Sequence, residues 1–412
     1  MKVWKKSLLM LLALIVLIVG TVAGYALTIR DTTVGALKST YIDTGSNNAE
    51  IIKATKPLTI LLMGVDTRGG ADAWAGNSDS QIVMTLNPQT DTTTMVSMER
   101  DTMVHILDGS GQDTGTVEKL NAAYPLGYNS GGLTSAAAWS EATISLQAGI
   151  KIDNFAAMNF DGIVSLVNAV GGIDIDNTSG TTLYISDTEP AYTAKVPPGK
   201  QHINGDQALV YARDRHHMAN GDYGRAAHQR EVLTQLVKKM LSLNNISQYQ
   251  SFLQKVSKDF KTSIPLTSST LPSLLGYRDC FKKVVSIQYE GVGDMYQGVS
   301  YQFTPNAEYL AVQNAMRKSL GQATSATVDS NLISYENRYG TTPSYLLPSA
   351  TVTENGKKTV YGVDEQGSFV SLNATNSANY VSTNGDSVSA DSSTSSSSAS
   401  TSTATVTSSV PQ

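Results

Sequence analysis

The chain has almost no cysteine and only a small excess of one charge sign. Cys280 is the single cysteine among 412 residues, so an intramolecular disulfide and a cysteine-based metal site are both excluded. The formal net charge is -5, with 30 Lys and Arg against 35 Asp and Glu. Nucleic-acid binding rests largely on excess cations that neutralise phosphates, so this balance argues against a nucleic-acid partner. Any anion site must be a local cluster of basic side chains.

Charge is also absent from one long stretch near the N-terminus. Residues 7–29 carry no charged side chain, and a helix needs about 20 apolar residues to cross a bilayer. The lysines within residues 1–6 predict a cytoplasmic N-terminus, a transmembrane anchor at 7–29 and an extracellular body after Arg30. A cleavable signal peptide is the alternative, because residues 24–26 resemble a small-residue cleavage site. In both interpretations the globular body is exported across the membrane.

Short buried strands alternate with helices across residues 56–320. Apolar or alternating runs predict strands at residues 58–65, 81–86, 93–98, 173–176, 182–186 and 284–289. Helical periodicity and capping signals predict helices at residues 135–148, 161–170, 204–212, 223–241 and 306–320. This order predicts an α/β fold with a central mixed sheet.

The segments outside this body are polar or weakly patterned. Residues 30–55 have the character of a stalk, and residues 321–381 that of a small C-terminal extension. Within the extension, Asn355-Gly356 predicts a hairpin turn. Residues 382–412 are almost wholly Ser, Thr and other small residues, which cannot bury a core and are predicted to be disordered.

Carboxylates and arginines converge at one end of the predicted sheet. Asp66 ends the first strand, Asp79 precedes the second, and Arg100-Asp101 follows the third. If the hairpin turns at residues 89–90, Asp79 and Arg100 are equally far from the turn and lie side by side. Asp66 and Asp79 are oxygen ligands suited to a hard cation such as Mg²⁺. The alternative is an ordinary cross-strand ion pair of little energetic weight.

A second basic cluster lies around the helix at 223–241. Arg213 and Arg215 leave the preceding short helix, and in an extended chain they point the same way. Arg225 and Gln229 lie on the inward stripe of the long helix near its N-terminus, where they form an anion cradle with the free N–H groups. Arginine forks suit phosphate oxygens, and Lys119 is the one candidate lysine. The alternative is a local cap in which Arg225 pairs with Asp222.

These segments resemble the LytR-CpsA-Psr family in content and order over about residues 56–320. The matching stretches are Leu61–Asp66, Ser78–Gln81 with Asn87-Pro88, Glu99–Thr102, Lys119–Tyr124, Asn159–Gly162, Asn204-Gly205, Tyr211–Arg215, and Asp222–Arg225 followed by Gln229. Two positions depart from the usual pattern: Asn77 and His228 stand where the family often has arginine.

The resemblance implies an α/β/α sandwich that transfers a glycopolymer, such as teichoic acid or capsular polysaccharide, from a polyprenyl-pyrophosphate carrier to peptidoglycan. It implies that Asp66 and Asp79 hold Mg²⁺ or Mn²⁺. The residues implied to hold the pyrophosphate are Arg100, Lys119, Arg213, Arg215, Arg225 and Gln229. The residues implied to be catalytic are Asp66, Asp79, Arg100, Asp101 and Arg225, with Asp66 and Asp101 both open as the base.

Two other functions use the same features. If water replaces the peptidoglycan acceptor, the protein is a polyprenyl pyrophosphatase. A third hypothesis is a non-enzymatic regulator of the cell envelope. Zinc at His216-His217 is disfavoured, because adjacent residues seldom point at one metal.

Overall fold

The computed structural model describes residues 40–44, 54–66, 74–186, 193–218, 221–241, 252, 254–265 and 270–382. The predicted anchor at residues 7–29 and nearly all of the Ser/Thr tail therefore lie outside the described residues. In the part that is described, no helix combines the length and apolarity needed to span a bilayer.

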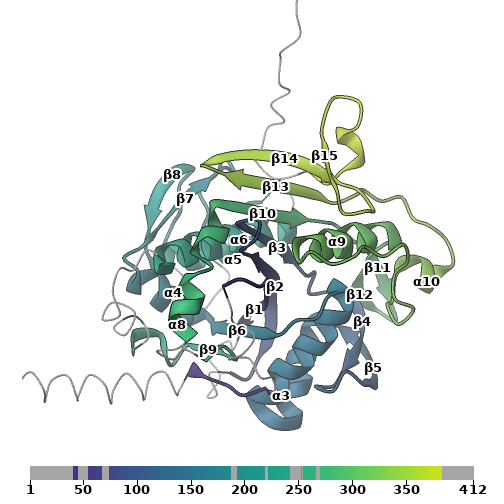
Figure 1. Ribbon diagram of the computed structural model, residues 1–412, viewed down its shortest axis with the longest axis horizontal. Helices are drawn as coiled ribbons and strands as arrows, with labels where there is room; N and C mark the ends of the chain where they lie inside the picture. The colour runs from purple at the N-terminus through teal and green to yellow at the C-terminus, as the bar shows by residue number, and fades with distance from the viewer. Residues whose placement is uncertain are drawn as a thin grey trace, which may run out of the picture.

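A large mixed sheet runs through the middle of the molecule (Figure 1). Within the described ranges it has nine strands in the order β15-β14-β13-β10-β3-β2-β1-β6-β9. In chain order these are β1 (Leu58–Asp66), β2 (Asn77–Asn87), β3 (Thr92–Ser97), β6 (Asn154–Asn159), β9 (Phe260–Thr262), β10 (Lys283–Gln288), β13 (Ser349–Glu354), β14 (Lys357–Val363) and β15 (Phe369–Ser371). The predicted α/β fold with a central mixed sheet is confirmed.

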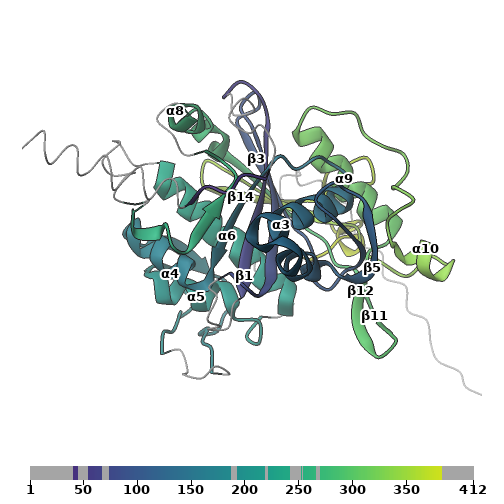
Figure 2. The ribbon, with the colours of Figure 1, turned by 90° about the horizontal axis from the view of Figure 1, so that it is seen from below.

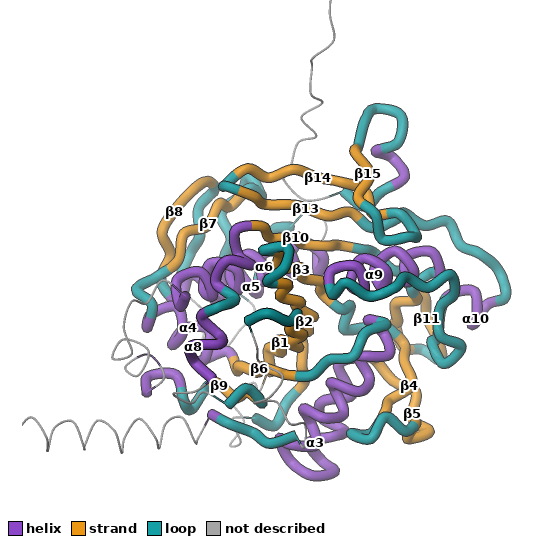
Figure 3. Tube along the Cα trace, viewed as in Figure 1, coloured by secondary structure: helices purple, strands orange, loops and turns teal. Residues whose placement is uncertain are grey.

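Helices cover both faces of this sheet (Figure 3). On one face pack α3 (Ala123–Ala148) and α9 (Asn306–Ser319), and on the other pack α4 (Phe160–Ala169), α5 (Gly205–Arg213), α6 (Gly221–Leu241) and α8 (Thr270–Leu275). Successive side chains of a strand point to opposite faces. In β1, Leu61 and Met63 accordingly join the core beneath α3 and α9, whereas Ile60 and Leu62 join the core on the α6 side.

Three small two-stranded sheets lie outside the central one in the described chain. They are β4 (Met103–Leu107) with β5 (Asp113–Lys119), β7 (Ile173–Asn177) with β8 (Gly199–Ile203), and β11 (Val292–Tyr296) with β12 (Val299–Phe303). The last of these pairs extends away from the body in Figure 2. The remaining short helices are η1 (Leu120–Ala122), η2 (Arg278–Lys282), α10 (Tyr335–Tyr339) and η3 (Ser377–Asn379).

Two predicted elements need correction. The strand predicted at 182–186 is wrong, because Leu183 makes only an isolated bridge to Val196. The helix predicted from Ser135 begins twelve residues earlier, at Ala123, and non-helical φ/ψ at Gly131 and Gly132 interrupt it. These glycines break the periodicity that marks a helix in the sequence, so the pattern predicts only the second half of α3.

The chain after residue 320 completes the sheet. Strand β13 pairs with β10 in antiparallel fashion, and β13 and β14 form the hairpin predicted around Asn355-Gly356. The turn before β15 lies on α9: Gly367 has φ +70, and a Cβ there would lie 2.2 Å from the backbone nitrogen of Ala315. The C-terminal segment therefore packs on the same body as the strands that precede it.

Gly367→Ala tests this packing, with Gly356→Ala as its matched control. Both glycines have positive φ, but a Cβ at Gly356 meets nothing within 4 Å. The two variants share the left-handed backbone penalty, and Gly367→Ala should lose about 1–3 kcal/mol more because the added carbon meets helix backbone. Urea unfolding of both variants measures the difference. Equal losses would show that this turn does not pack on α9.

Candidate functional site

An apolar pocket opens between the sheet and the helices of the α6 face. It has about 580 Å³ of empty space, including its opening. The lining is mostly apolar and comprises Leu62, Met63, Met158, Ile163, Val232, Leu233 and Leu236, together with Gly64 and Ala212. The polar lining residues are Ser80, Arg213 and Gln229. Leu236 lies two helical turns beyond Gln229, or about 10 Å along α6, so the polar groups occupy one end of the pocket.

Gln229 ties together the three elements that meet at the polar end. Its Oε1 accepts a hydrogen bond from Ser80 Oγ at 2.8 Å, and its Nε2 donates to the carbonyl oxygen of Ala212 at 3.2 Å. The predicted inward direction of Gln229 is confirmed. Arg225 lies one turn earlier on α6, on the same side of the helix. It is half-buried, and its Nε is enclosed.

A β-bulge positions Asp79 beside the pocket. Gly64 pairs with Ser80 but Val65 pairs with Ser78, so Asp79 is the extra residue of β2. Its Oδ2 lies 3.3 Å from Arg100 Nη1, and its Oδ1 accepts from Asn121 Nδ2 at 3.0 Å. The predicted neighbourhood of Asp79 and Arg100 is confirmed. A bulge re-aims a side chain that strict alternation would direct to the other face.

The ion pairs continue beyond Arg100 in a chain of alternating charge. Arg100 Nε lies 3.5 Å from Asp101 Oδ2, and Lys119 Nζ lies 2.8 Å from Asp101 Oδ1. The side chains of these residues and of Asp79 are between 16% and 28% exposed. They are ordered by one another yet remain open to solvent, which suits a surface that a large substrate must reach.

Asp66 and Asp79, the two predicted metal ligands, lie on neighbouring strands at this edge of the sheet. Asp66 is 8% exposed and pairs with Asn77 in the register of β1 and β2, next to the Asp79 bulge. In the described residues no group of three or more His, Cys, Asp or Glu is arranged to hold a metal ion. Mg²⁺ typically takes one or two protein carboxylates and fills its other positions with water and phosphate oxygens. That Asp66 and Asp79 hold such an ion stays a prediction.

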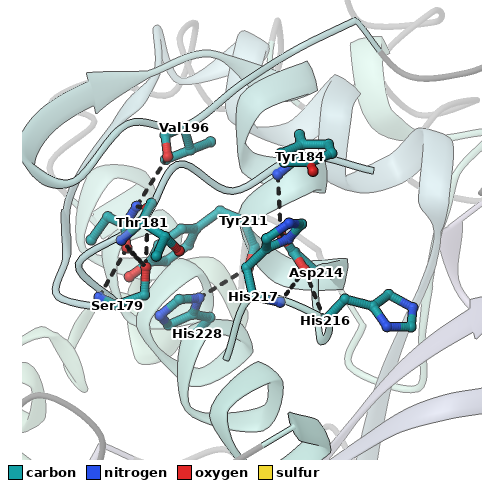
Figure 4. A network of polar contacts seen from close by, with 10 residues as sticks. Ser179, Thr181, Tyr184, Val196, Tyr211, Asp214, His216, His217 and His228 are labelled. Carbon is teal, nitrogen blue, oxygen red and sulfur yellow. Dashed lines mark hydrogen bonds and ion pairs between the residues drawn. The ribbon is translucent and has the colours of Figure 1, made fainter. Parts of the chain in front are cut away.

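A buried carboxylate that the sequence interpretation missed shapes the loop after α5. Asp214 is 2% exposed and accepts hydrogen bonds from the backbone N–H groups of Tyr184, His216 and His217 at 3.0, 3.0 and 3.2 Å (Figure 4). His217 Nδ1 lies 2.7 Å from its Oδ2. An Asp whose side chain accepts from the N–H groups two and three residues later is a recognisable turn signal. His217 is thus engaged by a carboxylate within its own loop.

The two arginines beside Asp214 occupy different environments. Arg213 is the last residue of α5 and lines the pocket, whereas Arg215 is exposed. The assumption that both lie in one extended segment is wrong, because the helix continues through Arg213. The structure therefore groups Arg213 with Gln229 and leaves Arg215 at the surface.

His228 is buried and neutral beside this site. Its ring stacks on Tyr211 with centroids 3.8 Å apart, and its Nδ1 lies 3.2 Å from the Tyr211 carbonyl oxygen. Burial lowers the pKa of His228 to about 4. It therefore contributes no positive charge near neutral pH.

Comparisons with known proteins agree with this architecture. A model of the LytR_cpsA_psr family matches residues 24–318. Biofilm regulatory protein A of Streptococcus mutans is 39% identical over 360 residues, covering 86% of this chain and 87% of that protein. Polyisoprenyl-teichoic acid–peptidoglycan teichoic acid transferase TagU of Enterococcus faecalis is 37% identical over 265 residues, covering 64% and 80%. The structure of protein gbs0355 from Streptococcus agalactiae has a TM-score of 0.64 at 42% identity, covering 72% of this chain and 98% of that one. The crystal structure of B. subtilis TagV has a TM-score of 0.51 at 30% identity, covering 65% and 99%.

The depressed pKa of His228 predicts a pH-dependent stability. The unfolded ring titrates near 6.5, so the stability that the neutral ring contributes is complete above that pH and is lost as pH falls toward 4. Between pH 7 and pH 5 the loss is about 2 kcal/mol. Chemical unfolding at both pH values should show a smaller loss for His228→Gln than for wild type. His105→Gln, at a partly exposed histidine, is the control. If His228→Gln lost as much unfolding free energy between pH 7 and pH 5 as wild type, the lowered pKa of His228 would be contradicted.

Proposed function

Because the chain belongs to the LytR_cpsA_psr family, we propose that it transfers a glycopolymer from a polyprenyl-pyrophosphate carrier to peptidoglycan. The observation that carries the proposal is an apolar pocket with Arg213 and Gln229 at one end, beside the carboxylate–arginine edge. The names of two relatives support this proposal: TagU of E. faecalis and TagV of B. subtilis are both named as polyisoprenyl-teichoic acid–peptidoglycan teichoic acid transferases.

The pocket matches the two halves of such a carrier. Its apolar lining suits an isoprenoid chain, which gains free energy from every methylene removed from water. Its polar end suits the pyrophosphate, since a guanidinium binds phosphate oxygens through two parallel hydrogen bonds. Arg213 and Gln229 lie there, and Arg225 and Arg100 belong to the adjoining elements. A lipid-linked pyrophosphate is therefore the ligand class that uses both ends of the site.

The reaction is a phosphoryl transfer. A hydroxyl oxygen of the acceptor forms a bond to the phosphorus that carries the glycan, and the bond from that phosphorus to the bridging oxygen breaks. Polyprenyl phosphate leaves, and the hydroxyl proton passes to a carboxylate, for which Asp66 and Asp101 are the candidates. Arginines aimed at the phosphates stabilise the charge that builds up on their oxygens. Asp101 lies between Arg100 and Lys119, which hold it in place at the solvent side.

Divalent metal and membrane attachment are part of the proposal. Asp66 and Asp79 are the residues that would hold Mg²⁺ or Mn²⁺, and the ion would neutralise charge on the phosphates. A lipid carrier with its headgroup at the outer face of the membrane requires the body to lie there. An N-terminal anchor at 7–29 with an extracellular body satisfies that requirement.

Arg213→Ala tests the substrate clamp. The loss of a charge-assisted hydrogen bond of about 1.5–3 kcal/mol should weaken binding of a polyprenyl-pyrophosphate-linked oligosaccharide by roughly 10- to 150-fold. Arg278→Ala is the matched control, because Arg278 is exposed at the opposite end of the strands. Melting temperature should be retained, since the Asp214 carboxylate is held by backbone N–H groups and His217. Destabilisation with intact affinity would show that Arg213 is structural.

The same preparations decide between transfer and hydrolysis. With purified peptidoglycan present, wild type should attach the oligosaccharide covalently through a phosphodiester. Release of free oligosaccharide phosphate at the same rate with and without acceptor would instead identify a pyrophosphatase.

Asp66→Asn and Asp79→Asn test the metal site. Each removes a charged oxygen ligand, so each should abolish divalent-dependent turnover while the protein remains folded. Asp113→Asn is the control, because that carboxylate is exposed on β5, away from the pocket. Turnover is measured as a function of Mg²⁺ concentration. Normal activity of both variants at limiting Mg²⁺ would rule out this pair as the ligands.

A further inference from the structure

A second pocket lies on the other side of α6, between this helix and strands β3, β10 and β13. It has about 880 Å³ of empty space, including its opening. On α6 its lining residues recur at helical spacing, as in His228, Glu231 and Lys238. The first pocket is lined by Gln229, Val232 and Leu236 on the opposite face of the helix. One helix therefore forms a wall of two separate pockets, and most residues that line the second carry polar side chains.

A buried arginine without a carboxylate partner lies in the second pocket. Arg230 is 3% exposed and donates to Ser286 Oγ, to Ser97 Oγ at 2.6 Å and to Gln288 Oε1 at 3.2 Å. A guanidinium has five N–H groups, so two remain after these three bonds. All three partners in the described structure are neutral. Burial lowers the pKa of Arg230 to about 10 without any opposing carboxylate. A buried charge of this kind is costly unless an anion pairs with it.

The side chains around Arg230 add further hydrogen-bond donors. Gln288 is 4% exposed, and its Nε2 has no hydrogen-bond partner in the described structure, while its Oε1 is taken by Arg230. A buried amide N–H without a partner is uncommon and indicates a missing acceptor. The hydroxyl of Ser286 accepts from Arg230, which leaves its own hydrogen available. The side chains that converge on this pocket therefore have unused hydrogen-bond donors, and acceptors for these donors are missing.

The charge of the lining is also positive. Lys238 and Lys358 join Arg230, whereas Glu231 is the one acidic residue among the described lining side chains. Glu231 Oε2 is occupied by the Tyr211 hydroxyl at 2.7 Å, and burial raises the pKa of its carboxyl. His228 is neutral near pH 7, as its lowered pKa requires. Three cations thus face one carboxyl that is already hydrogen-bonded.

We propose that this second pocket binds a soluble phosphate or phosphate monoester, held by the free N–H groups of Arg230, the amide of Gln288, and Lys238 and Lys358. A tetrahedral anion offers several acceptors to donors that converge from α6, β10 and β14, and it neutralises the buried guanidinium. Apolar lining is limited to a few side chains such as Met95 and Val284. The many polar side chains of its lining, rather than a lack of apolar surface, distinguish this pocket from the first one.

The test uses the full-length chain and inorganic phosphate as the probe. Melting temperature and calorimetric titration are compared in phosphate and in chloride at equal ionic strength. Lys238→Gln with Lys358→Gln should raise the phosphate dissociation constant by roughly tenfold or more, the effect of one lost charge-assisted hydrogen bond. Lys357→Gln is the matched control, because Lys357 is the exposed neighbour of Lys358 on β14 and lies outside the pocket.

Arg230→Gln gives a second readout that does not depend on absolute stability. In chloride its melting temperature should be unchanged or higher, because an uncompensated buried charge is removed. The rise in melting temperature that phosphate produces in wild type should disappear. Arg213→Ala, at the first pocket, should retain that rise. If Arg213→Ala abolishes phosphate binding while the double lysine variant and Arg230→Gln keep it, phosphate binds only at the first pocket and the proposal is wrong.

Discussion

The pairing of β1 with β2 is the constraint on which the site depends. Seven consecutive residue pairs place the apolar side chains of both strands in two cores, one on each face of the sheet. A one-residue bulge at Asp79 then ends this alternation. Without the extra residue, Asp79 would take the register position opposite Val65. With it, Asp79 meets Arg100 and Asn121, and the ion pairs continue from Arg100 through Asp101 to Lys119.

Much of this arrangement can be predicted from local sequence. The turn between β2 and β3 sets the register, and register alone predicts that Asp79 and Arg100 lie together. The 3.6-residue stripe of α6 predicts that Gln229 points inward. The bulge itself leaves no comparable signal, because residues 77–81 are all polar and show no alternation that an extra residue could interrupt. Asp214 combines both cases: its bonds to the N–H groups of His216 and His217 follow a local turn pattern, but nothing local indicates its contact with Tyr184, thirty residues away.

The elements that the sequence did not reveal are short, polar or long-range. Every residue of β5 is exposed or half-buried, so no apolar alternation marks Asp113–Lys119 as a strand. The strand predicted at 182–186 shows the opposite error, since alternation there reflects Leu183 packing into the core beside α5, with an isolated bridge to Val196 in place of a strand. The β13–β14 hairpin was predicted, but its pairing with β10 was not, because it joins segments about sixty residues apart. Pairings over such distances are set by the whole fold.

The C-terminal hairpin also protects the sheet against self-association. Strand β10 carries Val284, Val285 and Ile287, and β13 occupies its outer side. A chain shortened to residue 318, where the family match ends, would leave β10 as an unpaired edge with a full row of open N–H and C=O groups. Such an edge is a template for another chain, so the truncated protein would be expected to aggregate even with every site residue present. The residues after 320 therefore keep the protein soluble as well as folded, and a shortened form that is to stay monomeric must retain them.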